Sequence, residues 1–417
     1  MTEPQQIDTV RESSCSDAAQ AFLARAKVLE PVLHAFTSID AERLLAQARR
    51  LDDLPGEQRG PLHGLLLGVK EVYDAEGYAC GWGTEIHAQR RPAKDSAAVA
   101  SLRAAGALVA GITVSTEYAL AKTGPTTNPH DANRSPGASS QGSAAAVGAG
   151  LVPAALGSQT IGSIIRPAAY CGCVGFKPSR GLFDGRGSMP LSAALDHVGF
   201  FANNAALARQ LATVLQPDYA WNDATLPNGV ILLKPWYSDR IDASVSDAIA
   251  RAARRLSASR ISVEKASLPN WSGEAEETLI DTLLAHDMAA NHGGDFDRQG
   301  DKMSSRIRDY ILRGRELTPA SYQAALNERD RMAEYLDKLL EGRVAIIPAA
   351  TGVAPLRSEG TGSRAPQRLS TLLGQPSISV PVERHQGLPV GIQLVAARGS
   401  DKLVLNLAER LLETNAD

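Results

Sequence analysis

The sequence has few aromatic residues, few cysteines and no strong excess of either charge. Aromatic residues make up 5% of the 417 residues, and the formal net charge is -3. Such a balance gives no indication of a nucleic-acid partner or of an anionic membrane surface as a partner. The four cysteines have no spacing typical of a zinc site, so we expect reduced thiols, no metal and no cofactor.

Targeting patterns and long apolar runs are also missing. Residues 1–17 are polar and lack a basic segment followed by an apolar one, which argues against a signal peptide. The most apolar run, residues 144–156, is too short and too rich in glycine to span a bilayer. Together with the expected free thiols, these absences predict a cytoplasmic protein.

Several familiar catalytic motifs are absent as well. The sequence contains neither H-E-x-x-H nor a G-x-x-x-x-G-K-[ST] phosphate loop. It also lacks the G-x-S-x-G nucleophile elbow, because Gly137-Ala-Ser-Ser-Gln141 ends in glutamine. The eight histidines show no pairing that indicates a metal site or a Ser-His-Asp arrangement. A serine hydrolase with this sequence would therefore need a base other than histidine.

Helical and strand-like segments alternate along the chain. Apolar residues recur at helical spacing in residues 17–54 (with a break near Pro31), 97–105, 242–253, 319–341 and 401–413. Short apolar runs typical of buried strands occupy residues 64–69, 108–114, 344–348 and 377–381. This alternation predicts an α/β fold. No shift in composition marks a boundary, so we expect one domain over residues 1–417, with a more variable helical insert at about 217–342.

The most unusual stretch of the sequence is uncharged. The 27 residues 137–163 include six glycines, five serines and seven alanines. By composition alone, a close-packed helix flanked by turns is the simplest interpretation. The stretch also places glycine near Ser139-Ser140 and Ser163, where a flexible backbone can turn several N–H groups toward one point. Such a cluster of donors is what an oxyanion hole requires.

A lysine follows a short apolar run at Gly68-Val69-Lys70. Lysine is rarely buried, and burial disfavours its charged form, which can make it a general base near neutral pH. The alternative is that Lys70 extends to solvent or pairs with a carboxylate such as Asp74.

These residues lie in segments that resemble blocks of the amidase signature family. Residues 136–147, PGASSQGSAAAV, are similar to the P-G-G-S-S-G-G-S block of that family. Residues 155–163, ALGSQTIGS, resemble the block that carries its nucleophile. Further matches follow the family order: Gly68-Val-Lys70 with Asp74, and residues 166–172, 175–178, 195–199, 376–381 and 387–393. The resemblance extends from about residue 17 to residue 412, and it implies a mixed central sheet covered by helices.

The resemblance also implies a catalytic triad. Lys70 stands at the position of the base, Ser139 at that of a bridging serine held in a cis peptide, and Ser163 at that of the nucleophile. In the family, the lysine takes a proton from the bridging serine, which takes one from the nucleophile, and water later hydrolyses the acyl-enzyme. The oxyanion hole would be formed by four consecutive residues, Thr160, Ile161, Gly162 and Ser163.

The sequence departs from the family pattern at several positions. Ala138 and Gln141 replace glycines, and Ile161 replaces a glycine of the expected oxyanion hole. Gln159 stands where many members have aspartate, which is similar to a branch that includes malonamidase-like and biuret-hydrolysing enzymes. We expect three residues to bind substrate: Arg166, Ser140 and Gln159. For Arg166, a contact with a substrate carboxylate and simple bracing of its loop remain two alternatives.

The expected activity is therefore hydrolysis of the C–N bond of a small, linear, non-peptide amide. We expect this substrate to be the main partner, and the resemblance also allows a homodimer. One alternative is the catalytic subunit of a glutamine-dependent amidotransferase, which would need partner proteins. Another is a non-catalytic binding protein that retains the fold, although Lys70, Ser139 and Ser163 are all present.

Overall fold

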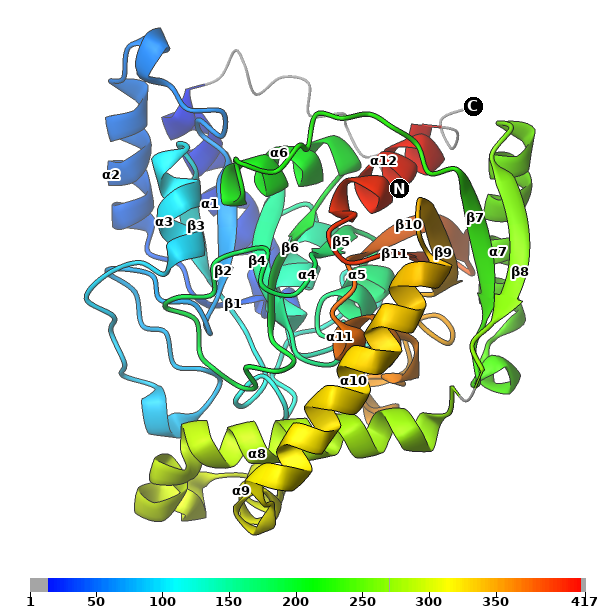
Figure 1. Ribbon diagram of the computed structural model, residues 1–417. Coiled ribbons are helices and arrows are strands. Elements are labelled where there is room, and N and C mark those ends of the chain that lie inside the picture. The colour runs from blue at the N-terminus through cyan, green and yellow to red at the C-terminus, as the bar shows by residue number, and fades with distance from the viewer. Residues whose placement is uncertain (1–13, 270, 414–417) are drawn as a thin grey trace.

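A mixed sheet of eleven strands runs through the computed structural model, which describes residues 14–269 and 271–413 (Figure 1). Neighbouring strands follow the order β1-β3-β2-β4-β6-β5-β10-β11-β9-β7-β8. In sequence order the strands are β1 (Phe36–Ser38), β2 (Leu66–Lys70), β3 (Leu108–Thr113), β4 (Ala154–Gln159), β5 (Val174–Lys177), β6 (His197–Ala202), β7 (Gly229–Lys234), β8 (Ser262–Ser267), β9 (Arg343–Pro348), β10 (Ser377–His385) and β11 (Leu388–Ala396).

Twelve α-helices surround this sheet within the described residues. They are α1 (Cys15–Leu33), α2 (Ala41–Asp52), α3 (Ala97–Ala104), α4 (Gln141–Gly148), α5 (Ile165–Cys171), α6 (Ala205–Leu215), α7 (Ala243–Ala258), α8 (Gly273–Gln299), α9 (Ser305–Glu316), α10 (Pro319–Leu339), α11 (Ala365–Leu373) and α12 (Asp401–Glu413).

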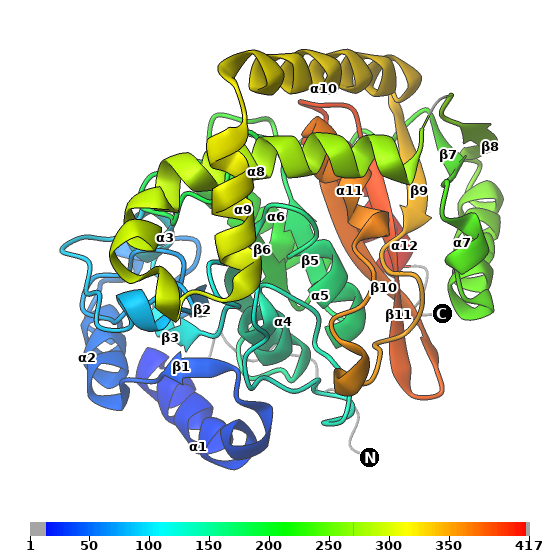
Figure 2. The same ribbon diagram turned by 90° about the horizontal axis from the view of Figure 1, so that it is seen from below.

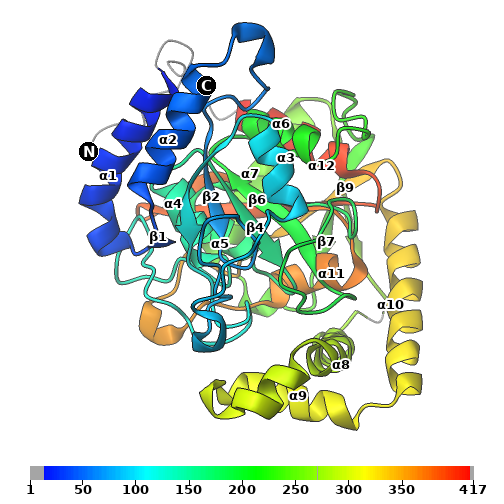
Figure 3. The same ribbon diagram turned by 90° about the vertical axis from the view of Figure 1, so that its left-hand side faces the viewer.

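Helices cover both faces of the sheet. On one face, α4 and α5 pack against the central strands, and α1 and α2 complete a small core built largely from alanine (Figure 3). On the other face, α3, α6 and α12 pack over the larger core. The structure is thus a single α/β domain with a large mixed sheet covered by helices, and the predicted fold class is confirmed.

The parallel strands β2 and β4 are neighbours and bring two distant segments together. Leu67 pairs with Ala154, and Val69 pairs with Leu156. The carboxyl ends of adjacent parallel strands meet at the same edge of a sheet. Lys70, the last residue of β2, therefore lies beside the end of β4 and the loop that follows it.

The sequence analysis located only some of these elements, and two regions differ from what it predicted. The break predicted near Pro31 in the segment 17–54 lies slightly later: α1 continues past Pro31 to Leu33, His34 adopts a left-handed φ of 49°, and the short strand β1 separates α1 from α2. The segment 217–342 is not helical throughout. It contributes β7 and β8 to the sheet, and β8 escaped sequence analysis because its side chains are mostly polar and exposed.

Helices α8, α9 and α10 form an arm at one end of the molecule. Helix α8 packs along α9, and both α8 and α10 contact α11 (Figure 2). None of the described helices combines the length and apolar character needed to cross a membrane. The arm matters for the site because α9 begins beside the cavity described below.

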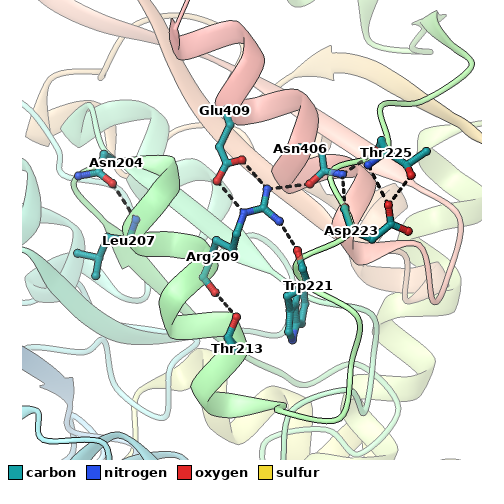
Figure 4. Close-up of polar contacts among 9 residues, drawn as sticks. All are labelled: Asn204, Leu207, Arg209, Thr213, Trp221, Asp223, Thr225, Asn406 and Glu409. Atoms are coloured by element: carbon teal, nitrogen blue, oxygen red, sulfur yellow. Dashed lines mark hydrogen bonds and ion pairs between the residues drawn. The ribbon is translucent and has the colours of Figure 1, made fainter. Parts of the chain in front are cut away.

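The segment before β7 is fastened by one arginine (Figure 4). Arg209 on α6 donates to both carboxylate oxygens of Glu409 on α12, at 2.8 and 2.5 Å. It also donates to the Asn406 side chain at 2.7 Å and to the backbone carbonyl of Trp221. Asn406 in turn donates to the backbone carbonyl of Asp223 at 2.8 Å. This network joins α6, α12 and the connection to the edge strands.

Replacing Arg209 with alanine should therefore destabilise the protein. The change leaves the partly buried Glu409 carboxylate and the Trp221 carbonyl without their donor, which typically costs about 2 kcal/mol. Urea unfolding measures the loss. The matched control is Arg331→Ala, which removes an exposed arginine–glutamate pair within one helix and should leave the unfolding midpoint nearly unchanged. Equal losses in both variants would contradict the role given to the Arg209 network.

Candidate functional site

Lys70 is completely buried and donates to two serine hydroxyls. Its Nζ lies 2.8 Å from Oγ of Ser139 and 2.9 Å from Oγ of Ser158. Ser139 lies just before α4, and Ser158 lies near the end of β4. The pairing of β2 with β4 brings Lys70 to these hydroxyls. The structure therefore joins two of the three predicted triad residues by a direct hydrogen bond.

The surroundings of Lys70 favour its neutral form. Burial is the main cause that lowers the pKa of Lys70 to about 7, and the negative charges of Glu71 and Asp196 only partly oppose this effect. Within the part of the chain that the structure describes, no carboxylate forms an ion pair with the Lys70 ammonium. A large share of Lys70 is therefore deprotonated near neutral pH and able to accept a proton.

The backbone around Ser139 has an unusual conformation. The peptide bond between Ala138 and Ser139 is cis, and Gly137 has a left-handed φ of 84°. A Cβ atom at residue 137 would lie 2.8 Å from Cα of Pro167, so only glycine fits there. Arg166 donates from Nη2 to the carbonyl of Ala138 at 2.9 Å. These contacts fix the direction of the Ser139 side chain.

Ser163 and Ser139 line the same cavity of about 230 Å³. Ser163 precedes α5 and is 8% exposed, so its hydroxyl is reachable but shielded from bulk water. The remaining wall is formed by the residues Thr116, Ala119, Leu120, Ala121, Lys122, Thr123, Ala138, Thr160, Ile161, Arg166, Ser304, Arg306, Thr361 and Arg364. The cavity thus offers space for a small substrate next to the two serines.

The loop between β4 and α5 has the features of an oxyanion hole. Among the described residues, none accepts a hydrogen bond from the backbone N–H groups of Ile161, Gly162 or Ser163. A Cβ atom at residue 162 would lie 2.7 Å from Oε1 of Gln367, which explains the glycine there. Ile161 has a negative φ, so its side chain is compatible with this turn. These free donors beside Ser163 suit a developing negative charge.

Gln159 and Ser140 brace the loops rather than line the cavity. The Gln159 side chain is fully buried, and its oxygen accepts from the backbone N–H groups of Ile164 and Ile165 at 2.8 and 3.0 Å. The Ser140 hydroxyl bonds to the backbone of Ser158. Because neither side chain reaches the cavity wall, the structure does not support their predicted contact with substrate.

Arg166 both braces the loop and faces the cavity. Its two Nη atoms donate to the carbonyls of Ala138 and Gly362, whereas its buried Nε has no partner among the described residues. Burial lowers the pKa of Arg166 to about 10. No described carboxylate pairs with this guanidinium. The bracing alternative is thus seen directly, and a contact with substrate remains a prediction.

Two residues of the site were missed by sequence analysis. Ser158 is the second hydroxyl on Lys70, although it lies inside the block that resembles the nucleophile segment. Asp196 accepts from Oγ1 of Thr160 at 2.7 Å and from the backbone of Leu191 and Ser192, and burial raises its pKa to about 6. The only sequence signal for Asp196 was its position in the segment 195–199, which resembles a block of the family. Through Thr160, Asp196 holds the loop between β4 and α5.

Comparisons with known proteins find one family that covers most of the chain. A family model described as Amidase matches residues 17–405. A glutamyl-tRNA(Gln) amidotransferase subunit from Anaeromyxobacter sp. (strain K) is 32% identical to this chain, and the match covers 96% of this chain and 92% of the relative. A solved structure described as an amidase is 32% identical, with a TM-score of 0.86 and 96% of both chains covered.

Another solved structure is described as a vestigial protein complex that reveals the evolutionary origins of an s-triazine catabolic enzyme. It is 28% identical to this chain, with a TM-score of 0.86, and the match covers 96% of this chain and 95% of the other. The names of these similar proteins therefore indicate different activities. The comparisons support the predicted family but do not separate the malonamidase-like and biuret-type branch from the others.

The lowered pKa of Lys70 should make the free energy of unfolding depend on pH. The folded-state pKa of about 7 lies below the ordinary value of 10.5. Below pH 7 the lysine is protonated in both states and its burial cost is complete, whereas this cost falls as the pH rises from about 7 toward 10.5. The free energy of unfolding of the native protein, relative to Lys70→Met, should thus rise by roughly 1.4 kcal/mol per pH unit.

Urea unfolding of both proteins at pH 7.5, 8.5 and 9.5 measures this difference. Methionine keeps a similar volume without the titrating group, so groups common to both proteins cancel in the comparison. The two lost hydrogen bonds to serine change the difference by the same amount at each pH. A difference that stays constant over this window would contradict the lowered pKa of Lys70.

Proposed function

Because the chain belongs to the amidase family, we propose that it hydrolyses the C–N bond of a small amide through an acyl-enzyme on Ser163. The observation that carries the proposal is the hydrogen bond of 2.8 Å between the buried Lys70 and Ser139, at a cavity that Ser163 also lines. The lowered pKa of Lys70 supplies a base at a cavity whose described wall holds no histidine.

The first half of the reaction uses the two serines as a proton relay. The Ser163 oxygen forms a bond to the amide carbonyl carbon while its proton moves to Ser139, and the proton of Ser139 moves to neutral Lys70. The carbonyl oxygen becomes negative and accepts from the free N–H groups of the loop 161–163. The proton then returns through Ser139 to the nitrogen, the C–N bond breaks, and the amine or ammonia leaves.

The second half repeats the relay with water. A water molecule takes the place of the leaving amine and loses a proton through Ser139 to Lys70 as its oxygen bonds to the acyl carbon. The bond between that carbon and the Ser163 oxygen then breaks, and the proton returns to Ser163. The relay thus ends in its starting state: the proton that left with the amine came from Ser163, and the proton of the water molecule replaces it.

The wall of the cavity supports a small substrate. Ile161 lines it with a side chain where the family pattern has glycine, and this side chain takes up space beside the nucleophile. A cavity of about 230 Å³ suits a small, linear, non-peptide amide better than a long chain. Ile161 is therefore proposed to limit the size of the acyl group.

A second candidate is the catalytic subunit of a glutamine-dependent amidotransferase. The relatives named as subunits of glutamyl-tRNA(Gln) amidotransferase match nearly the whole chain, at 28–32% identity. The two candidates share the chemistry at Ser163 and differ in the substrate and in the need for partner proteins.

A panel of small amides, ureas and carbamates, together with glutamine, tests the proposal. Ammonia release by the isolated chain from a small amide supports the amidase. Release from glutamine alone, or only after other subunits have been added, supports the amidotransferase. No release from any of these compounds, with no labelling of Ser163 by a fluorophosphonate, would indicate a non-catalytic protein.

Ser163→Ala should lower turnover by several orders of magnitude and leave the fold intact. The change removes the attacking oxygen but no packing contact, and loss of a nucleophile has effects of this size. Turnover and the thermal midpoint are measured together. The control is Ser304→Ala, which removes another serine side chain from the wall of the same cavity and should keep most of the activity. Near-native turnover in Ser163→Ala would reject the nucleophile.

The variants Lys70→Ala and Ser139→Ala should each lower kcat strongly, and the double variant should be little worse than either. Groups that act as one unit in a reaction are far from additive. In the native protein, kcat/KM should rise with pH through about 7, because only neutral Lys70 accepts a proton. Additive losses, or a flat profile between pH 5.5 and 8.5, would speak against the relay.

A further inference from the structure

The charged residues on the cavity wall are all cationic. Lys122, Arg166, Arg306 and Arg364 line the cavity, and no described aspartate or glutamate does. This gathering is notable because the chain as a whole carries a net charge of -3. A concave, partly enclosed surface with charge of one sign concentrates ligands of the opposite sign.

Arg306 and Arg364 reach this wall from parts of the chain far from the catalytic segments. Arg306 lies in the first turn of α9, and Arg364 immediately precedes α11. Figure 2 looks onto the end of the molecule where these helices lie. The fold thus brings two arginines from outside the family blocks to the cavity that Ser163 lines.

Neither arginine has a direct carboxylate partner among the described residues, although the charge of Asp281 acts on Arg364. No described carboxylate forms an ion pair with Arg306 or Arg364, and the buried Nε of Arg306 has no hydrogen-bond partner among the described residues. An unpaired guanidinium at a sheltered site is costly unless something else supplies the negative charge. Arg306 does lie over the ring of Tyr310, with 6.0 Å from the guanidinium carbon to the ring centre, but this contact brings no negative charge.

Two acidic groups in this part of the molecule have other partners. Asp281 accepts from the Tyr310 hydroxyl at 2.8 Å and from Arg313 at 3.2 Å. Glu117 is buried and accepts from the backbone N–H of Ser304 at 3.0 Å. These carboxylates hold the framework of the arm and do not pair with the two arginines.

The pKa values of Arg364 and Arg166 reflect this lack of direct carboxylate partners among the described residues. Burial lowers the pKa of Arg364 and the positive charge of Arg306 lowers it further, whereas Tyr310 and Asp281 only partly oppose these effects. The charges of Arg364 and Arg306 also lower the pKa of Arg166, after the larger effect of burial. The three guanidinium groups therefore repel one another across a cavity whose described wall contains no compensating carboxylate.

We propose that Arg306 and Arg364 form a carboxylate-binding subsite, so that the substrate is a small amide that also carries a free carboxylate. A guanidinium presents parallel N–H donors that match the two oxygens of a carboxylate. Bound in this way, the carboxylate places the amide carbon near Ser163 and compensates the positive charge of the wall. This inference rests on the proposed amidase activity and specifies its substrate class.

The direct test compares succinamate with succinamide, which differ by one carboxylate in place of an amide. The native protein should show a kcat/KM at least about tenfold higher for succinamate, since one charge-assisted contact is worth about that factor. Arg306→Gln and Arg364→Gln should each remove most of this preference and leave the rate with succinamide nearly unchanged. The matched control is Arg308→Gln, because Arg308 lies on the same helix but not on the cavity wall.

Two outcomes overturn the subsite. One is equal kcat/KM for the two compounds in the native protein, and the other is an equal loss with both compounds in the glutamine variants. Calorimetry with Ser163→Ala separates this inference from the catalytic proposal. Tighter binding of succinamate than of succinamide to that variant supports the subsite even if no amide is hydrolysed. Equal binding, together with hydrolysis of neutral amides, rejects the subsite and keeps the amidase.

Discussion

The hydrogen bond from the buried Lys70 to Ser139 is the interaction on which the rest of the site depends. A lysine in this position has no carboxylate partner among the described residues, and the polar groups that it contacts are two serine hydroxyls. The parallel pairing of β2 with β4 brings Lys70 beside the segment that contains Ser139. Because burial disfavours the charged ammonium form of Lys70, this side chain can act as a base near neutral pH.

The residues around this contact have two roles. Some hold the loops in place, and others face the cavity in which we propose that the substrate binds. Gln159, Ser140 and Asp196 hold the two serine-bearing loops through backbone hydrogen bonds, and Arg166 ties these loops to Gly362. In the proposed mechanism this bracing holds the loop with the free N–H groups of residues 161–163 in place, so little reorganisation is needed when charge develops. The proposed specificity then comes from Ile161 and from Arg306 and Arg364, which the start of α9 and the residue before α11 bring to the same cavity.

Sequence alone predicted the part of the site that lies in local motifs. The resemblance of the Gly/Ser/Ala stretch and of Gly68-Val-Lys70 to blocks of the family predicted that Lys70 and Ser139 meet, whereas composition alone left a close-packed helix as the simplest interpretation. Sequence could not tell that Gln159 faces backbone N–H groups rather than the cavity, since a motif match does not give a side chain its direction. Arg306 and Arg364 were out of reach, because only the course of the chain through α8 to α11 places them beside Ser163. Strand β8 was missed because its exposed polar residues carry no apolar pattern.

Covalent labelling tests the central claim, a Ser163 nucleophile activated through Lys70, most directly. The protein is treated with a small fluorophosphonate at several pH values, and the adduct is located by intact mass and peptide mapping. The account predicts one adduct per chain, on Ser163, at a rate that rises with pH through about 7 and is almost lost in Lys70→Ala. An adduct on another serine, or labelling of Ser163 at the same rate without Lys70, would contradict it.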